Sequence, residues 1–229
     1  MDIVYFYKAT NDDAEITYSL RSVEKNFPGH KVWIYGDKPR NIEPDVYVRA
    51  TQYGGMKWDR VHKMLIKVCK NKEISEDFYL FNDDFFILQP TDMIPPLYNG
   101  TILEHVNAIE ERHQQKISSY TRRLRHTGIE LRNRGYRNLN YAIHVPLPVN
   151  RKKGLETLTT FPNNPMFRNL YGNQHDIGGF YNRDPKITRL EDLPHEDDKY
   201  ISTSDKSFFK GEIGRYLRDM FPNKSRWEL

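Results

Sequence analysis

Cysteine is almost absent from this 229-residue sequence, in which Cys69 is the only one. A single cysteine excludes an internal disulfide bond and, without companion ligands, a thiolate zinc site. The sequence also contains no apolar stretch close to the length that spans a bilayer, and its first residues carry neither the basic region nor the small-residue cleavage site of a signal peptide. These absences predict a cytoplasmic protein.

The glycine-rich motifs of common nucleotide-binding folds are missing too. No Gly-x-Gly-x-x-Gly follows the first predicted strand and no Gly-Lys-Ser/Thr phosphate loop occurs, so neither a dinucleotide-binding fold nor a P-loop enzyme is supported. Internal repeats and low-complexity segments are absent as well. With 38% hydrophobic and 13% aromatic residues, the chain can build one substantial core, and we expect a single α/β domain over residues 1–229.

The first forty residues predict a strand, a helix and a second strand. Residues 2–7 and 31–35 are short apolar runs, and residues 15–26 between them place apolar side chains on one helical face. Such a unit implies a right-handed crossover and a parallel sheet, whose ligands lie where strands end in loops. The residues that we expect near a ligand at these strand ends are Tyr7, Lys8 and Asp37.

A second amphipathic helix is predicted over residues 58–71. Lys57, Arg60 and Lys63 crowd its first turns, where the helix dipole already favours an anion. We interpret this helix end as a diphosphate-binding site. The alternative is a solvated helix face, because exposed basic residues are common on helices.

The most specific pattern is the apolar run of residues 77–88, which is interrupted only by Asn82, Asp83 and Asp84. A run of this length predicts a strand buried on both faces, and buried carboxylates need a compensating partner. Two adjacent carboxylates and a carboxamide at the carboxyl end of a central strand supply the oxygen ligands that Mg²⁺ or Mn²⁺ prefers. We therefore assign Asp83 and Asp84 to a divalent metal. The alternative is a surface turn, because Asn-Asp-Asp is also a turn sequence.

Positive charge is concentrated in residues 112–137, although the net charge of +4 is modest. Tyrosines and histidines alternate with the arginines there, a mixture typical of surfaces that hold phosphates and stack on bases or sugars. A solvated helix face and loop explain the same residues equally well. The arginines are Arg122, Arg123, Arg125, Arg132, Arg134 and Arg137, and the tyrosines are Tyr120 and Tyr136.

A histidine precedes a short proline-rich segment further along the chain. His144 lies in residues 139–149, a predicted strand in which two prolines forbid ordinary central pairing. A lone histidine is more often structural than catalytic, and both interpretations stay open. His144, Asp37 and Asp176, which lies in a later polar cluster, are all candidates for a catalytic base, and geometry has to decide between them.

Several of these segments together resemble the GT-A nucleotide-sugar transferases, and more narrowly the Stealth proteins, which transfer sugar 1-phosphates onto glycans. The end of the chain is similar to the tails of small bacteriophage-type glycosyltransferases. The segments that carry the Stealth resemblance span most of the chain and are residues 18–27, 32–37, 78–86, 144–148 and 161–162, with Asp176. The segments that carry the bacteriophage resemblance are residues 202–209 and 221–228.

The resemblance implies a GT-A-like, Rossmann-like domain with a mixed, mostly parallel sheet flanked by helices. Residues 1–110 are then expected to bind the nucleotide-sugar donor, a UDP-sugar by preference, and residues 111–229 to form the acceptor side. It implies that Asp83 and Asp84 bind Mn²⁺ or Mg²⁺ and that His144 lies at the reaction centre. The remaining expected site residues are Asp84 in a catalytic role, Arg21 on the donor, and Arg122, Arg123, Arg125 and Tyr136 on the acceptor.

Three functions are open to such a chain. The first, which we favour, is a metal-dependent glycosyltransferase whose acceptor is a hydroxyl group, either on a modified base in DNA, as expected for a bacteriophage enzyme in the host cytoplasm, or on a glycan. The second is transfer of a sugar 1-phosphate, with His144 and Arg168 facing the β-phosphate. The third is a non-catalytic nucleic-acid-binding protein, which does not explain the buried pair of acids.

Overall fold

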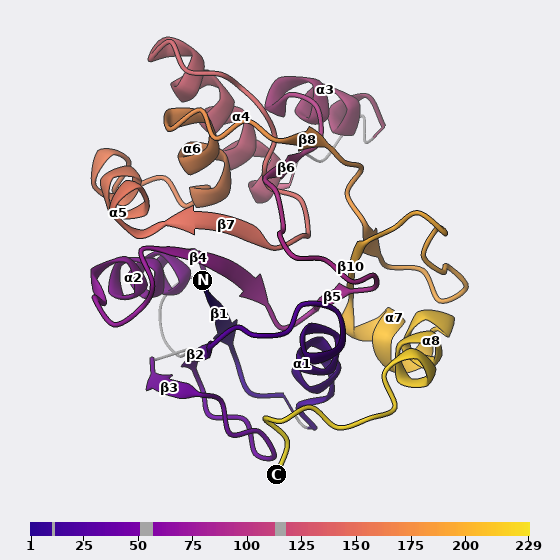
Figure 1. The fold of residues 1–229 in the computed structure, drawn as a ribbon. Coiled ribbons are helices and arrows are strands. Elements are labelled where there is room, and N and C mark those ends of the chain that lie inside the picture. Colours follow the sequence, from indigo (N-terminus) through magenta and orange to yellow (C-terminus); the bar gives the residue numbers. More distant parts are fainter. Residues whose placement is uncertain (11, 51–56, 113–117) are drawn as a thin grey trace.

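The computed structural model describes residues 1–10, 12–50, 57–112 and 118–229. A central five-stranded sheet is formed by β1 (Asp2–Tyr7), β2 (Val32–Gly36), β3 (Val46–Arg49), β4 (Asp77–Asn82) and β7 (Leu147–Asn150). The strand order is β3-β2-β1-β4-β7 (Figure 1). The first four strands of that order are parallel, and β7 runs antiparallel to β4 at the edge. The predicted mixed, mostly parallel sheet is confirmed.

Alternate side chains of β1 enter two different cores on the two faces of this sheet. Ile3 and Tyr5 pack with Leu20 of the helix on one face, and Val4 packs with Leu65 on the other. Figure 1 shows that helices cover both faces of the sheet. These helices are α1 (Ala14–Asn26) on the first face, and α2 (Lys57–Lys70) with α5 (Arg151–Thr160) on the second.

Residues 77–88 do not form one strand, contrary to the prediction. The central strand ends at Asn82, Asp83 and Asp84 make a turn, and the following residues enter a second sheet of order β5-β10-β9. The turn preference of Asn-Asp-Asp therefore determines the local backbone, and Phe86 is buried in a separate core. The elements around this core are β5 (Phe85–Ile87), β9 (Lys186–Ile187), β10 (Tyr200–Thr203), α7 (Asp205–Lys210) and α8 (Glu212–Met220).

A group of helices covers the region beyond β7. It contains α3 (Ile102–Arg112), α4 (Ser119–Asn133) and α6 (Phe167–Gln174), with a small ribbon of β6 (Leu97–Tyr98) and β8 (Phe180–Tyr181) (Figure 1). The predicted strand over residues 139–149 is much shorter than expected, because asparagine side chains of α6 replace the sheet ladder at its start. Asn173 Oδ1 accepts from Leu139 N at 2.7 Å, and Asn169 Oδ1 accepts from Tyr141 N at 2.7 Å.

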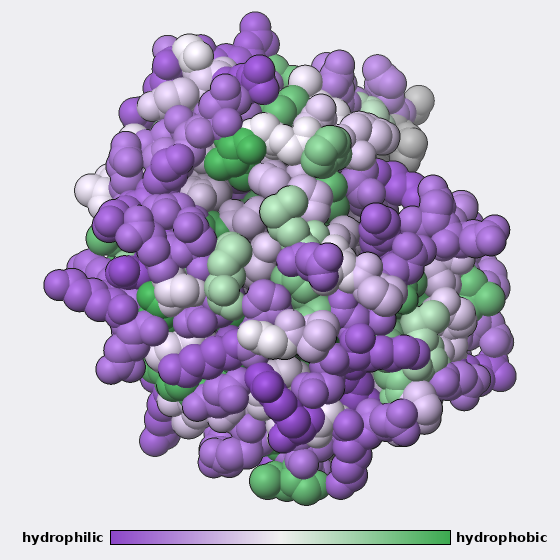
Figure 2. All heavy atoms as spheres, in the orientation of Figure 1, coloured by the Kyte–Doolittle hydropathy of each residue, from purple (hydrophilic) through white to green (hydrophobic). Residues whose placement is uncertain are grey.

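The surface is mostly polar. Figure 2 shows hydrophilic residues over most of one face, with weakly polar and apolar residues gathered near its middle. Phe180 and Tyr181 of β8 are among the exposed large side chains. Within the described ranges, no helix has the length and apolar character needed to cross a bilayer.

Candidate active site

The acidic turn lies where β4 leaves the central sheet. Asp83 and Asp84 directly follow this strand, so they lie at the carboxyl edge of the parallel strands, where open α/β sheets bind ligands. Asp84 Oδ2 accepts hydrogen bonds from Lys186 Nζ at 3.1 Å and from Ser202 Oγ at 2.9 Å. A lysine and a hydroxyl therefore hold this carboxylate in one orientation.

A third carboxylate lies near the turn and changes its electrostatics. Burial raises the pKa of Asp83 to about 7, and the charges of Asp84 and Glu15 add to this shift. Glu15, near the start of α1, has its pKa raised to about 7 as well, first by burial and then by Asp84, against an opposing hydrogen bond from Thr203. The positive charge of Lys186 therefore compensates the acids only in part.

The carboxylate oxygens of the acidic turn fit a divalent metal whose other ligands are water and substrate oxygens. Asp83 and Asp84 offer the hard carboxylate ligands that Mg²⁺ and Mn²⁺ prefer. In the described part of the chain, no group of three or more metal-ligating side chains comes together. Mg²⁺ is usually bound through one or two carboxylates and completes its shell with water and substrate phosphates. Two aspartates are therefore sufficient, and the metal assignment stays a prediction.

His144 has an acidic partner that the sequence did not indicate. Its Nδ1 atom lies 3.0 Å from Asp184 Oδ1 and 2.9 Å from Oδ2, and its backbone N–H donates to Oδ1 at 3.1 Å. Burial alone raises the pKa of Asp184, but the hydrogen bonds and charge of His144 outweigh it and hold that pKa below its usual range. An ionised Asp184 therefore fixes the ring through Nδ1, which leaves Nε2 as the nitrogen for proton transfer.

A buried arginine supports the loop that carries this histidine. Arg168, on α6, donates from Nη1 to the carbonyl oxygens of the two residues flanking His144, at 3.1 and 2.7 Å. Burial lowers the pKa of Arg168 to about 10, although Asp84 and Asp184 attract its charge. Its Nη2 atom is buried and has no hydrogen-bond partner within the described residues. In the described part of the chain, the N–H groups of this Nη2 nitrogen therefore have no acceptor, and they lie near the acidic turn.

The short segment 184–186 connects the histidine with the acidic turn. Asp184 binds His144, and two residues later Lys186 binds Asp84. Lys186 opens β9, which pairs with β10 in the second sheet, so the backbone of this segment is held in place. The two clusters therefore belong to one candidate site.

The predicted diphosphate-binding helix begins close to this site. Trp58 of α2 stacks on Tyr120 of α4 with ring centroids 6.2 Å apart. Burial raises the pKa of Tyr120, and the charge of nearby Asp184 adds to the shift. The first turns of α2 are therefore neighbours of the histidine cluster. They carry the three predicted cations: Lys57, whose side chain lies outside the described part, Arg60 and the exposed Lys63.

Tyr7, Lys8 and Asp37 lie at the same edge, where β1 and β2 end. The Tyr7 hydroxyl donates a hydrogen bond to Asp13, and burial raises the pKa of this tyrosine. Asp37 Oδ2 accepts from Ala9 N at 3.0 Å, while Lys8 is exposed. Tyr7 and Asp37 thus shape the loop after β1, and their contact with a donor stays a prediction.

Two further predicted residues form ion pairs of their own. Arg21 binds Glu228 through two hydrogen bonds, Nε to Oε1 at 2.8 Å and Nη2 to Oε2 at 2.7 Å, which ties α1 to the end of the chain. Asp176 pairs with Arg137 at 3.2 Å between exposed side chains. The acid that holds His144 is Asp184 rather than Asp176.

The basic stretch is engaged in part by neighbouring acids. Arg125 pairs with Glu110, and Arg134 pairs with Glu130 at 3.5 Å. Tyr136 packs against the buried cluster between α3, α4 and α6. These contacts reduce the positive charge that the stretch can offer to a phosphate backbone.

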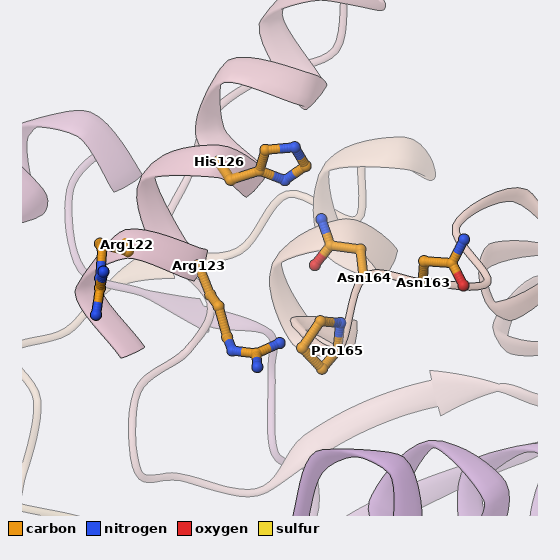
Figure 3. Close-up of a pocket in the computed structure, with 6 residues that line it drawn as sticks. All are labelled: Arg122, Arg123, His126, Asn163, Asn164 and Pro165. Carbon is orange, nitrogen blue, oxygen red and sulfur yellow. The ribbon is translucent and has the colours of Figure 1, made fainter. Parts of the chain in front are cut away.

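Other residues of α4 line a small hollow. Figure 3 shows Arg123 and His126 facing Asn164 and Pro165 across it. The hollow has a volume of about 200 Å³, and Arg122 also lines it. Arg122 and Arg123 are therefore the predicted acceptor residues that border a cavity.

Comparison with solved structures decides the fold. A crystal structure of the galactosyltransferase LgtC in complex with donor and acceptor sugar analogues matches 98% of this chain and 96% of that chain, with a TM-score of 0.55 and 10% sequence identity. The fold is that of the GT-A glycosyltransferases. No protein-family model matches the sequence, and no curated protein does.

Two further solved structures with lower scores add nothing to this GT-A assignment. An active-site mutant of LgtC has a TM-score of 0.49 at 11% identity, over 96% of this chain and 95% of that chain. Mouse xyloside xylosyltransferase 1, in its apo form, has a TM-score of 0.38 at 7% identity, over 99% of this chain and 95% of that chain.

Within this GT-A domain, the sequence did not reveal the partners of the predicted residues. Asp184 and Lys186 lie in a polar segment without apolar periodicity. Ser202 is in β10, which pairs with β5 and β9. The only local signal in the sequence is the β-prone run of residues 200–203, which forms β10. The pairing of this strand with distant strands could not be deduced from that run.

Proposed function

We propose that the protein is a metal-assisted glycosyltransferase that moves a sugar from a nucleotide donor to a hydroxyl group. The proposal rests on the contacts that join two clusters of side chains. In the acidic turn after β4, Asp84 binds Lys186, and two residues earlier in the chain Asp184 binds His144. Segment 184–186 therefore connects the acidic turn with the histidine. The GT-A fold supports the same conclusion.

The donor diphosphate binds between the acidic turn and the first turns of α2. Asp83 and Asp84 hold Mn²⁺ or Mg²⁺, which when bound neutralises the charge that builds on the departing phosphate oxygens. Lys57, Arg60 and Lys63 supply positive charge at a helix end that already favours an anion. Residues 1–110 form the donor half, and a UDP-sugar is the donor to test first.

His144 removes the proton of the acceptor hydroxyl. Its Nδ1 atom is held by Asp184 at 2.9 Å, so Nε2 accepts the proton, and the ionised Asp184 stabilises the imidazolium that forms. Among the other candidates, Asp176 is exposed and paired with Arg137, and Asp37 accepts a hydrogen bond from the backbone of the loop after β1. Geometry therefore favours His144.

A transfer assay with labelled UDP-sugars tests this assignment. Loss of a positioned general base lowers kcat by about 100-fold or more, so His144→Ala should show this loss while its donor affinity, measured by calorimetry, changes little. Asp84→Asn should lose metal-dependent donor binding. Wild-type turnover in both variants would contradict the proposal. Donor turnover that disappears in Asp84→Asn would also exclude a purely nucleic-acid-binding role.

Sugar 1-phosphate transfer is the second candidate, and Arg168 favours it. Its buried Nη2 lacks a partner within the described residues, and a guanidinium stabilises the charge of a transferring phosphoryl group. Stealth-like chemistry would place His144 and Arg168 on the β-phosphate. Mass spectrometry of the product distinguishes the two reactions, because a phosphoglycosyl product is heavier than a glycosyl product by one phosphoryl unit, HPO3.

In the acceptor half, residues 111–229, the acceptor binds near Tyr120. This ring lies near Asp184 and stacks on Trp58, and Arg122 and Arg123 follow on the same helix. Aromatic stacking with nearby arginines suits a base of single-stranded DNA or a sugar. Offering labelled donor with hydroxymethyl-pyrimidine DNA and with an oligosaccharide decides the acceptor. Transfer only to the oligosaccharide would exclude the bacteriophage-type DNA reaction.

A further inference from the structure

We infer that Lys186 is a donor-binding residue. Its ammonium group is paired with Asp84 in the donor-free enzyme and moves to the donor diphosphate when a divalent cation binds Asp84. This inference rests on the proposed function. Lys186 would then couple binding of the metal to binding of the donor.

The first observation concerns a single oxygen atom. Asp84 Oδ2 accepts from Lys186 Nζ at 3.1 Å and from Ser202 Oγ at 2.9 Å. A divalent cation such as Mg²⁺ binds carboxylate oxygens at about 2.0–2.1 Å. An ammonium group and a divalent cation on the same carboxylate repel each other, so binding of the metal weakens the ion pair of Lys186.

The second observation concerns which parts of Lys186 can move. Its backbone is fixed, because it pairs with Ser202 across β9 and β10, and Asp184 accepts a hydrogen bond from its N–H. Its side chain is 27% exposed, and four rotatable carbons separate the ammonium group from that fixed backbone. The ammonium group can therefore swing away from Asp84 without disturbing the segment that orients His144.

The third observation is the surrounding charge. Glu15, Asp83 and Asp205 act electrostatically on one another beside Asp84. Arg168 lies near Asp84, but its Nη1 atom is committed to two backbone carbonyl groups. Among the described residues, Lys186 forms an ion pair with Asp84 at 3.1 Å, and a diphosphate bound next to the metal offers its ammonium group a new anionic partner.

Calorimetric titration of Mn²⁺, with and without UDP, tests the inference. Lys186→Met should bind Mn²⁺ alone about tenfold more tightly than the wild type, because Asp84 no longer has to release its lysine. With saturating Mn²⁺, the same variant should bind UDP about tenfold more weakly, the loss expected for one charge-assisted hydrogen bond. Lys186→Arg, which keeps the charge, should behave like the wild type.

Lys199→Met is the matched control, because Lys199 is exposed and directly precedes β10. It should leave both affinities unchanged. Equal Mn²⁺ affinity in the wild type and Lys186→Met, or unchanged UDP affinity, would overturn the inference. If Lys186→Met fails to fold, as judged by thermal unfolding, Lys186→Gln takes its place. Failure of the proposed function gives a different result, namely wild-type protein that binds no UDP in the presence of Mn²⁺.

Discussion

At the scale of single residues, the site is defined by charges that are compensated unequally. Asp184 has its pKa held below the usual range by His144. Asp83 and Glu15 have theirs raised to about 7 by burial and by neighbouring acids. A carboxylate with a satisfied partner fixes geometry, whereas crowded carboxylates attract a cation. The two clusters are therefore suited to different tasks.

Replacing one acid of the turn should separate metal binding from folding. We expect Asp84→Asn to abolish the Mn²⁺-dependent stabilisation by UDP, which for a ligand at about 100 times its Kd amounts to about 2.7 kcal/mol. The ligand-free variant should still unfold cooperatively. Thermal unfolding with and without Mn²⁺ and UDP measures both effects. Asp92→Asn, at an exposed acid outside the site, is the control, and undiminished stabilisation in Asp84→Asn would refute the metal assignment.

Removing the charge of Asp184 should have an effect that depends on pH. A carboxylate whose folded pKa is depressed stabilises the fold above its unfolded pKa of about 4, and this contribution disappears as pH falls through the folded pKa. The side chain is 32% exposed, so we expect Asp184→Asn to lose only about 1 kcal/mol at pH 7. Urea unfolding between pH 5 and pH 3, below the range in which histidines usually change charge, checks this. A difference from the wild type that does not shrink between pH 5 and pH 3 would contradict the account.

Isolated residues gave a signal in the sequence, but their partners in the structure did not. Asp83 and Asp84 were conspicuous because they interrupt an apolar run, and His144 because prolines follow it. Asp184 and Lys186 could not be found in the same way, since their importance comes from the pairing of β9 with β10. Such long-range pairing leaves no periodic signal in a polar segment.

At the scale of elements, packing between helices depends on a few small residues. Gly154 of α5 faces α2, and a Cβ atom placed on it would lie 2.9 Å from Cys69 Sγ and 3.3 Å from Val149 Cγ1. Alanine is favoured over glycine in a helix by about 1 kcal/mol, but overpacking a core costs about 1–3 kcal/mol. At position 154, the steric conflict of an added Cβ atom should therefore outweigh the higher helix propensity of alanine.

A double-mutant cycle tests this balance. Gly154→Ala should destabilise the wild type by about 1 kcal/mol, whereas in a Cys69→Ala background, where the sulfur is gone, it should stabilise the protein by a similar amount. Urea unfolding of all four proteins gives the coupling. The same change in both backgrounds would show that the sulfur of Cys69 does not limit the approach of α5.

Elements with a clear period were predicted well, and those shaped by side-chain hydrogen bonds were not. Helix α1 and strands β1 and β2 match their expected positions within a residue. The run 77–88 was divided by its own turn residues, and most of 139–149 is irregular because Asn169 and Asn173 bind its backbone. Local turn chemistry and distant amide groups overrode hydrophobicity in both cases.

At the scale of the whole molecule, a GT-A sheet brings distant segments to one edge. The acidic turn, the loop of His144 and the segment 184–186 meet there, although more than a hundred residues separate Asp84 from Lys186. The basic stretch of residues 112–137 runs beside the same site, and three of its arginines, Arg125, Arg134 and Arg137, already have acidic partners.

These ion pairs predict a weak dependence of DNA binding on salt. A duplex contact releases counterions with a log–log slope of about −0.9 per phosphate. If only Arg122, Arg123 and Arg132, the three arginines without an ion pair in the described part of the chain, bind phosphates, the slope should be about −3, against about −5 if all six arginines did. Fluorescence anisotropy over a range of salt concentrations measures it. A slope near −5 would mean that the pairs of Arg125, Arg134 and Arg137 open on DNA.

A crystal soaked with Mn²⁺ and UDP would show whether the acidic turn binds a metal together with the diphosphate, because manganese can be located by its anomalous scattering. We expect an anomalous peak within coordination distance of Asp83 and Asp84, with the diphosphate between that peak and the first turns of α2, and with Lys186 released from Asp84. A diphosphate bound without manganese in the hollow of Arg122, Arg123 and His126, with Lys186 still on Asp84, would contradict it.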